Sequence, residues 1–157
     1  MDIFATDIVL VPIHYKAPLH WALIAVDMRN RTVTYYDSLL TAGLGDFVIG
    51  AMHTFLVEEH LNRRGTKLNF QFRSLWDKAA PQQENGHDCG VYVCQFANHL
   101  SQDALFNIKQ RDMPMYRQLI VWEIASNSFY APPSAELNDS LILGIDNIEM
   151  QDFNPAD

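Results

Sequence analysis

A change of hydrophobic period after residue 37 constrains the fold of this chain more than any other feature. Residues 7–13, 20–26 and 32–37 are runs rich in β-branched and aromatic side chains, which is typical of strands. Residues 46–64 instead place apolar side chains on one face of a helix, at Phe47, Val48, Ala51, Met52, Phe55 and Leu56. Strands followed by a helix predict an α+β fold, with a mainly antiparallel sheet and helices packed against it.

The same patterns order the elements along the chain. Residues 20–26 are apolar on both faces, which predicts a central strand, and the polar residues 27–31 form a turn into the next strand. Another short strand is expected within residues 67–76. Helices are predicted over residues 89–100 and 112–124, where apolar side chains again recur at helical spacing.

Composition predicts one domain followed by an acidic tail. Residues 1–126 are long enough to bury a core, whereas residues 127–157 are expected to form a solvated, disordered extension that the pair Pro132-Pro133 sets apart. The net charge of −8 is uneven, because the last 22 residues hold six acidic residues and no Lys or Arg. Residues 1–135 carry 13 acidic and 11 basic residues, without the basic stripe that a nucleic-acid binder needs.

The sequence also lacks the signals of membrane and secreted proteins. No apolar run reaches the roughly 20 residues of a membrane span, so we expect no membrane partner. The N-terminus lacks the basic start and long apolar stretch of a secretory signal. Two cysteines cannot build a disulfide framework, which favours a reducing compartment such as the cytosol or the nucleus.

Cys89 stands at a position that cysteine chemistry prefers. It follows a polar, glycine-containing turn in the stretch PQQENGHDCGVYVC, and Asp88 before it is a suitable N-cap. In the first turn of a helix the free N–H groups and the helix dipole favour the thiolate, which is the nucleophilic form. The alternative is a buried, unreactive small side chain. Cys94, in the middle of the helix among apolar residues, is expected to be packed.

His20 and Asp37 are candidates for the general base and its orienting partner. His20 opens the second predicted strand and Asp37 closes the third. A symmetric hairpin centred in the predicted turn makes them direct cross-strand neighbours on one face, whereas a slip of one residue puts them on opposite faces. The alternative for His20 is an ordinary hydrogen-bonded residue at a strand end.

A nucleophile of this kind also needs a donor for the oxyanion, and two glutamines are available. Gln82 and Gln83 both lie in the turn before the predicted helix, and chemistry alone does not choose between them. Metal and nucleotide sites have little support. Cys89 and Cys94 are turned by about 140° from each other on a helix, and the sequence contains no C-x-x-C, H-E-x-x-H or glycine-rich phosphate loop.

Four stretches in order resemble the SUMO-specific (sentrin-specific, Ulp-type) cysteine proteases. They are HWAL from His20, YYDSL from Tyr35, PQQENGHDCGVYVC from Pro81 and DMPMYRQLIVWEI from Asp112. The resemblance covers roughly residues 7–124 and implies a papain-like, Ulp-type fold with the catalytic domain in residues 1–126. It implies no metal and no cofactor.

The resemblance also implies a role for each candidate residue. His20 is the general base, Asp37 its orienting partner and Cys89 the nucleophile of a Cys-His-Asp triad. Gln83 rather than Gln82 is the oxyanion donor. Trp21 matches the tryptophan that covers the narrow tunnel for the substrate's Gly-Gly end, where only residues without side chains fit beneath an indole.

The implied reaction is cleavage after the C-terminal Gly-Gly of SUMO, at an isopeptide bond to a target lysine or at a peptide bond in the SUMO precursor. SUMO and SUMO-conjugated proteins are the implied partners, and the nucleus, with or without the cytoplasm, is the implied location. Two alternatives stay open. One is a catalytically impaired paralogue that binds SUMO or ubiquitin-like proteins or regulates a relative, and the other is a protease for another ubiquitin-like modifier such as NEDD8.

One departure from the family pattern bears on activity. Family domains begin well upstream of the strand before the histidine, with a W-L-x-D-type segment and a second tunnel tryptophan that this sequence does not contain. The resemblance therefore implies a catalytic domain shortened at its N-terminal side. Loss of those layers predicts exposed apolar sheet surface, and with it self-association or a partner chain.

Overall fold

A computed structural model describes residues 2–40 and 44–129 of the chain. The chain divides into two compact units, Met1–Met113 and Pro114–Asp157, and each is considered by itself. The predicted acidic tail lies outside the described residues from residue 130 onward. In the described part, no helix combines the length and the apolar character that crossing a membrane requires.

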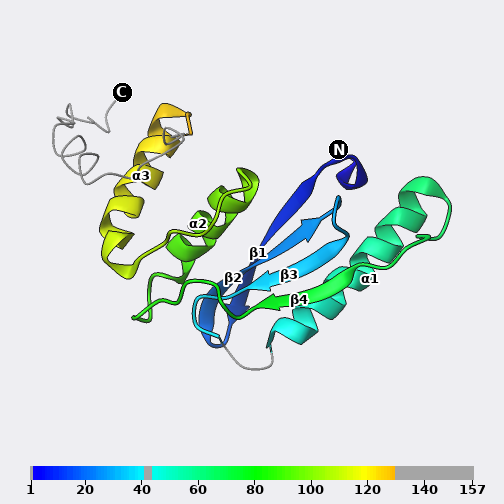
Figure 1. The fold of residues 1–157 in the computed structure, drawn as a ribbon, viewed down its shortest axis with the longest axis horizontal. Coiled ribbons are helices and arrows are strands. Elements are labelled where there is room, and N and C mark those ends of the chain that lie inside the picture. Colours follow the sequence, from blue (N-terminus) through cyan, green and yellow to red (C-terminus); the bar gives the residue numbers. More distant parts are fainter. Residues whose placement is uncertain (1, 41–43, 130–157) are drawn as a thin grey trace. The chain divides into compact units, whose positions relative to one another are not determined.

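The first unit is built on a mixed sheet of four strands, β1 (Ile8–Lys16), β2 (Leu19–Asp27), β3 (Thr32–Tyr36) and β4 (Arg73–Asp77), in that spatial order (Figure 1). β1 with β2 and β2 with β3 pair antiparallel, and β3 with β4 pairs parallel. The prediction of a mainly antiparallel sheet with β2 inside it is therefore confirmed. Alternate residues of a strand face opposite sides, so β2 buries side chains on both faces of the sheet.

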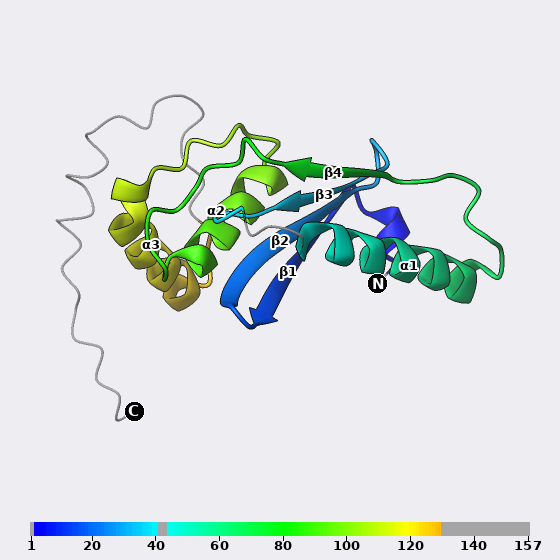
Figure 2. The same cartoon turned by 90° about the horizontal axis from the view of Figure 1, so that it is seen from below.

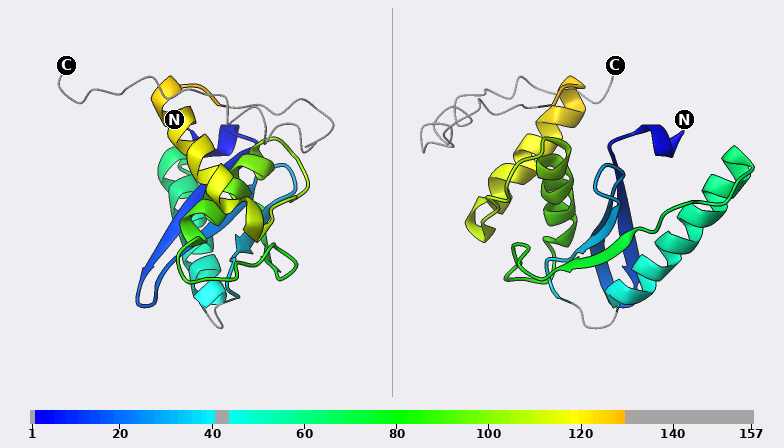
Figure 3. Two further views of the ribbon diagram at one scale, coloured as in Figure 1. Left: turned by 90° about the vertical axis from the view of Figure 1, so that its left-hand side faces the viewer. Right: turned by 45° about the vertical axis from the view of Figure 1, so that its right-hand side comes forward.

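Helices accompany this sheet on both sides. α1 (Leu44–Arg64) packs against β3, and α2 (Cys89–Ser101) packs against β2 and β1. Figure 2 shows α1 running along the sheet, and the right-hand view of Figure 3 shows the sheet between α1 and α2. Short 3₁₀ turns, η1 (Ile3–Ala5) and η2 (Gln110–Asp112), complete this unit. α3 (Met113–Ser126) begins at the boundary and continues into the second unit, close to its predicted bounds.

The core of the first unit lies between α1 and the sheet. Its buried members are Ala22, Ile24, Val26, Val33, Tyr35, Val48, Ile49, Leu56 and Phe72. The residues of β2 and β3 in this cluster alternate along each strand, which is the period-2 pattern of one sheet face. The opposite face meets α2, where the Tyr36 ring lies 6.0 Å from the ring of Phe96. The elements that carry His20 and Asp37 are therefore held by packing on both faces.

Candidate active site

Cys89 is the first residue of α2, as the sequence predicts, and it is buried. Asp88 occupies the N-cap position, but its side chain makes no capping hydrogen bond. Its Oδ2 instead accepts hydrogen bonds from Asn85 Nδ2 and from Gln110 Nε2, each at 2.7 Å. The aspartate thus fixes the turn that leads to Cys89, rather than the helix end itself.

His20 and Asp37 form a buried hydrogen-bonded pair. His20 Nε2 lies 2.7 Å from Asp37 Oδ1, and both side chains are almost fully enclosed. An ionised carboxylate can only accept a hydrogen bond, so Nε2 carries the proton in this contact. In neutral histidine the other ring nitrogen is then a proton acceptor. The pair thus holds His20 in the tautomer that a general base needs.

The two residues meet diagonally and not as direct cross-strand neighbours, so that part of the sequence prediction is wrong. The hairpin pairs Asp27 with Thr32 and Leu23 with Tyr36, which centres it one position later than predicted. Asp27 anchors this turn, since its carboxylate accepts hydrogen bonds at 2.8 Å from both Asn30 N and Asn30 Nδ2. This later centre shifts the cross-strand partner of each residue by two positions. His20 and Asp37 therefore stay on the same face of the sheet, because side chains alternate between the two faces with period 2.

The second ring nitrogen of His20 is buried and has no hydrogen-bond partner in the described part of the chain. The structure therefore does not form a hydrogen bond between Cys89 Sγ and His20 Nδ1. Catalytic hydrogen bonds are often long in free enzymes and tighten when substrate binds. A buried polar atom without a hydrogen-bond partner lowers the stability of the fold by about 1–3 kcal/mol. A role in function would explain why this cost at His20 Nδ1 is tolerated.

Gln83 and Gln82 differ in what their side-chain amides bind. Gln82 Nε2 donates to the carbonyl oxygens of Asp37, at 2.9 Å, and Ala80, at 2.8 Å, which uses both of its hydrogens. Gln83 is buried, and its Nε2 donates one hydrogen bond to the Asn85 carbonyl oxygen. Within the described residues the amide of Gln83 thus donates one hydrogen bond, whereas the amide of Gln82 donates two and bridges two loops.

Ser38 is a residue that the sequence patterns did not single out. Its hydroxyl donates to Gln83 Oε1 at 2.6 Å, and Gln83 N donates to the Ser38 carbonyl oxygen at 2.8 Å. Because the carbonyl end of the Gln83 amide is engaged by Ser38, its NH₂ end must point away from that residue. The place of Ser38 directly after Asp37 was the available sequence signal.

Trp21 lies beside the start of α2. A Cβ atom built on Gly90 would come within 3.9 Å of Trp21 Cδ1, so the indole passes close to the residue after Cys89. Trp21 is 40% exposed, and its ring packs at a tilt of 32° against the ring of His14, with 4.5 Å between ring centroids. A partly exposed indole thus lies next to the N-terminus of α2.

The prediction that Cys94 is packed is wrong, because the structure leaves this side chain exposed. Cys94 follows Cys89 by five positions, and five helical residues turn the side chain by about 140°. The buried face of α2 carries Cys89, Tyr92 and Phe96, so Cys94 points away from it. Within residues 2–40 and 44–129, no group of three or more His, Cys, Asp or Glu side chains could hold a metal ion.

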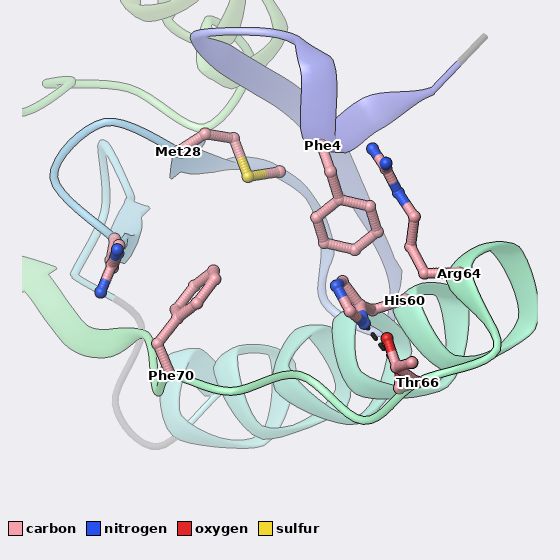
Figure 4. A pocket seen from close by; sticks show the side chains of 7 residues that line it. Phe4, Met28, His60, Arg64, Thr66 and Phe70 are labelled. Carbon is pink, nitrogen blue, oxygen red and sulfur yellow. Dashed lines mark hydrogen bonds between the residues drawn. The ribbon is translucent and has the colours of Figure 1, made fainter.

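A pocket of about 340 Å³ lies apart from these residues, between η1, the turn after β2 and the end of α1 (Figure 4). Its polar side chains already have partners within the protein. Arg64 pairs with Asp2, the Arg31 guanidinium lies 4.3 Å from the centre of the Phe70 ring, and His60 Nδ1 is 2.9 Å from the Thr66 carbonyl oxygen. None of the candidate catalytic side chains lines this pocket.

Comparisons with known proteins identify the family of this chain. The family model described as "Ulp1 protease family, C-terminal catalytic domain" matches residues 1–127. A sentrin-specific protease of Caenorhabditis elegans is 37% identical over 132 residues, which are 83% of this chain and 18% of that protein. Human sentrin-specific protease 2 is 34% identical over 127 residues, 79% of this chain and 21% of that protein.

Solved structures show the same fold. The C-terminal Ulp1 protease domain in complex with Smt3, the yeast orthologue of SUMO, matches with a TM-score of 0.66 and 29% identity, over 80% of this chain and 55% of that one. Ulp1 with its catalytic cysteine oxidised to a sulfenic acid matches with a TM-score of 0.67 and 28% identity, over 81% of this chain and 56% of that one. This chain therefore spans about a fifth of the full-length relatives and about half of the Ulp1 domain. Its fold is Ulp1-like, and the chain belongs to the Ulp1 protease family.

Proposed function

We propose that this chain is a thiol protease that cleaves after the C-terminal Gly-Gly of SUMO. The observation that carries the proposal is the buried His20–Asp37 pair in a chain of this family, in which His20 Nδ1 has no hydrogen-bond partner among the described residues. A proton acceptor is needed at that nitrogen for a cysteine nucleophile to act. The complex of Ulp1 with Smt3 supports SUMO as the substrate class.

In the proposed mechanism Cys89 Sγ transfers its proton to His20 Nδ1, and the thiolate attacks the carbonyl carbon of the terminal glycine. Asp37 holds the ring and stabilises the imidazolium that forms. The free N–H of Gln83 Nε2 and the backbone N–H of Cys89 stabilise the oxyanion. Collapse breaks the C–N bond, and His20 gives its proton to the departing amine. Water then attacks the thioester carbonyl carbon while His20 takes up a proton from it. The C–S bond breaks, and His20 returns the proton to the Cys89 thiolate.

Trp21 completes the proposed site as the cover over the diglycine. In this proposal the indole beside Gly90 covers an extended chain closely, and two glycines suit such a place because they carry no side chains. The same contact excludes bulk water from one side of the reacting carbonyl, which strengthens the hydrogen bonds that stabilise the oxyanion. Isopeptide conjugates and SUMO precursors share this diglycine, so both are proposed substrates.

The test uses SUMO that carries a C-terminal vinyl sulfone in place of the scissile carbonyl. The wild-type chain, Cys89→Ser and His20→Ala are mixed with the probe, and the masses of the products are measured. We expect a covalent adduct in the wild type, none in Cys89→Ser and a much slower one in His20→Ala. Ubiquitin and NEDD8 probes are run in parallel. An adduct with NEDD8 or ubiquitin but not with SUMO would show that the proposed substrate is wrong. A folded chain that reacts with none of the three probes would overturn the protease proposal and favour a binding or regulatory role.

Two further predictions concern the setting of the protein. Residence in the nucleus, with or without the cytoplasm, is tested by imaging the tagged chain in cells. Self-association or binding of a partner chain is tested by light scattering of the purified protein across a concentration series. Leu19 and Phe47, exposed by 78% and 77%, are apolar side chains that such contacts would cover.

A further inference from the structure

The Asp37 carboxylate is held by residues of two strands and the following loop. Its Oδ1 accepts hydrogen bonds from His20 Nε2 at 2.7 Å and from Leu39 N at 2.8 Å. Its Oδ2 accepts a hydrogen bond from the Tyr35 hydroxyl at 3.1 Å. The position of the carboxylate is therefore set from both of its oxygens, and only one of them faces the histidine.

Tyr15 extends this arrangement to a third strand. The Tyr15 hydroxyl lies 3.2 Å from the Tyr35 hydroxyl, and the Tyr15 ring lies parallel to the His20 imidazole, with 6.3 Å between centroids and 6° between planes. Tyr15 on β1 is the registered partner of His20 on β2. Four side chains on one face of the sheet thus contact one another in a ring: Tyr15, Tyr35, Asp37 and His20.

We propose that Tyr35 is a positioning residue for the reaction, with Tyr15 fixing the Tyr35 hydroxyl in place. Tyr35 holds Oδ2 so that Oδ1 stays directed at His20 Nε2, and through it the imidazole keeps the orientation in which Nδ1 receives the thiol proton. This inference rests on the proposed cysteine chemistry. It goes beyond that chemistry by naming two residues that touch neither the nucleophile nor the substrate.

The surroundings of Tyr35 suit a donor that never ionises. Burial, the hydrogen bond with Tyr15 and the negative charge of Asp37 together raise the pKa of Tyr35 far above its ordinary value. The hydroxyl therefore stays protonated at any pH at which the protein works. The ring itself is fixed, because the indole of Trp76 meets it edge-on at 5.6 Å between centroids.

Other titratable groups near Asp37 belong to the elements packed around it. β1 contributes Tyr15, β2 His20 and β3 Tyr35, and α2 begins with Cys89. On β4, Asp77 is the registered partner of Tyr36, and its charge helps to raise the pKa of Tyr36. His20 and Tyr35 both donate hydrogen bonds to the Asp37 carboxylate, and the Tyr35→Phe change removes the second of these without altering charge.

The experiment compares Tyr35→Phe with Tyr36→Phe, its neighbour in the same strand, whose ring contacts Phe96 and Phe106. All proteins carry Cys94→Ser, so that Cys89 is the one thiol, and circular dichroism verifies their folding. The rate of Cys89 alkylation by iodoacetamide is measured against pH, because this reaction needs no SUMO. Hydrolysis of a SUMO C-terminal fluorogenic amide gives kcat and KM for the same proteins.

We expect Tyr35→Phe to lower kcat by about tenfold with KM nearly unchanged, since hydrogen bonds to charged groups are the strong ones. The acid limb of the alkylation profile should move to higher pH, because an imidazole that is no longer held in place stabilises the Cys89 thiolate less well. Tyr36→Phe should match the parent. Tyr15→Phe should act in the same direction but less strongly, and it should add little in the Tyr35→Phe background.

A Tyr35→Phe profile that superimposes on the parent, or moves to lower pH, overturns the inference. So does a loss in Tyr36→Phe equal to that in Tyr35→Phe. If the acid limb of the alkylation profile moves to higher pH but no variant cleaves SUMO, the positioning role of Tyr35 is supported and the proposal of SUMO as substrate is wrong. If SUMO is cleaved equally well by Tyr35→Phe and the parent, the proposed function holds and the positioning role fails.

Discussion

The hydroxyl of Ser38 donates a hydrogen bond of 2.6 Å to the side-chain carbonyl oxygen of Gln83, and both side chains are buried. The two residues are 45 positions apart in the sequence, and a second bond joins Gln83 N to the Ser38 carbonyl oxygen. This pair determines which end of the Gln83 amide is available to a substrate.

Removal of the Ser38 hydroxyl is therefore expected to impair the reaction and not the binding of substrate. In Ser38→Ala the Gln83 amide loses the contact that sets its orientation, so kcat for a SUMO fluorogenic amide should fall about tenfold while KM changes little. Ser74→Ala removes an exposed hydroxyl that contacts His53 and should leave both constants unchanged. Equal kinetics for Ser38→Ala and Ser74→Ala would show that the Gln83 amide needs no such anchor.

The two neighbouring glutamines should separate by the kind of defect they cause. Gln83→Ala is expected to lower kcat by about 10²–10³, because it removes the proposed donor to the oxyanion, and also to lower Tm, because it leaves the buried Ser38 hydroxyl without its acceptor. Gln82→Ala breaks the bridge between the Asp37 and Ala80 carbonyl oxygens, so it should lower Tm. Kinetics and thermal unfolding of both variants measure this, and a reversed pattern would exchange their roles.

Two glycines of α1 form a matched pair for stability. A Cβ on Gly45 would lie 2.9 Å from Tyr35 Cδ1, so Gly45→Ala should cost about 1–3 kcal/mol of the free energy of unfolding by overpacking. A Cβ on Gly50 meets nothing within 4 Å, so Gly50→Ala should stabilise the helix by about 0.5–1 kcal/mol. Urea denaturation of both variants tests the sign of each effect, and stabilisation by Gly45→Ala would contradict the close approach.

The turn between β2 and β3 should contribute stability that depends on pH. Burial alone would raise the pKa of Asp27, but the hydrogen bonds from Asn30 and the nearby charge of Arg29 lower it below the ordinary 3.8. A lowered folded-state pKa stabilises the fold above the unfolded value and loses this effect as the pH falls through the folded value. The difference in unfolding free energy between wild type and Asp27→Asn should therefore be constant near neutral pH and shrink below pH 3.8. A difference that does not vary with pH would exclude this linkage.

Much of the architecture follows from local patterns in the sequence. The strands and helices of residues 2–40 and 44–129 lie within a few residues of their predicted bounds, because hydrophobic period and turn residues act locally. The position of Cys89 at the start of α2 is also a local property. The comparison with the family adds the arrangement of these elements in space, because local hydrophobic patterns do not determine it.

The parts that failed depend on contacts between distant residues. The hairpin register was set by Asp27 capping its own turn, which period alone does not reveal, and the exposure of Cys94 depended on which face of α2 meets the sheet. Chemistry alone left the choice between Gln82 and Gln83 open, and the two amides differ in their partners on the loop after β3. Tyr15 and Tyr35 escaped notice because their contact exists only in the observed register of three strands.

The adjacency of Asp37 and Ser38 also limits how the length of this chain can vary. Asp37 holds the histidine and Ser38 holds Gln83, so one peptide bond separates the anchors of the proposed base and of the proposed oxyanion donor. An inserted residue between them would displace one anchor or the other. Insertions in the Met28–Arg31 turn, at the opposite end of β3, leave both anchors in register. Among relatives of this chain, insertions and deletions should therefore occur in that turn and not between the residues that correspond to Asp37 and Ser38.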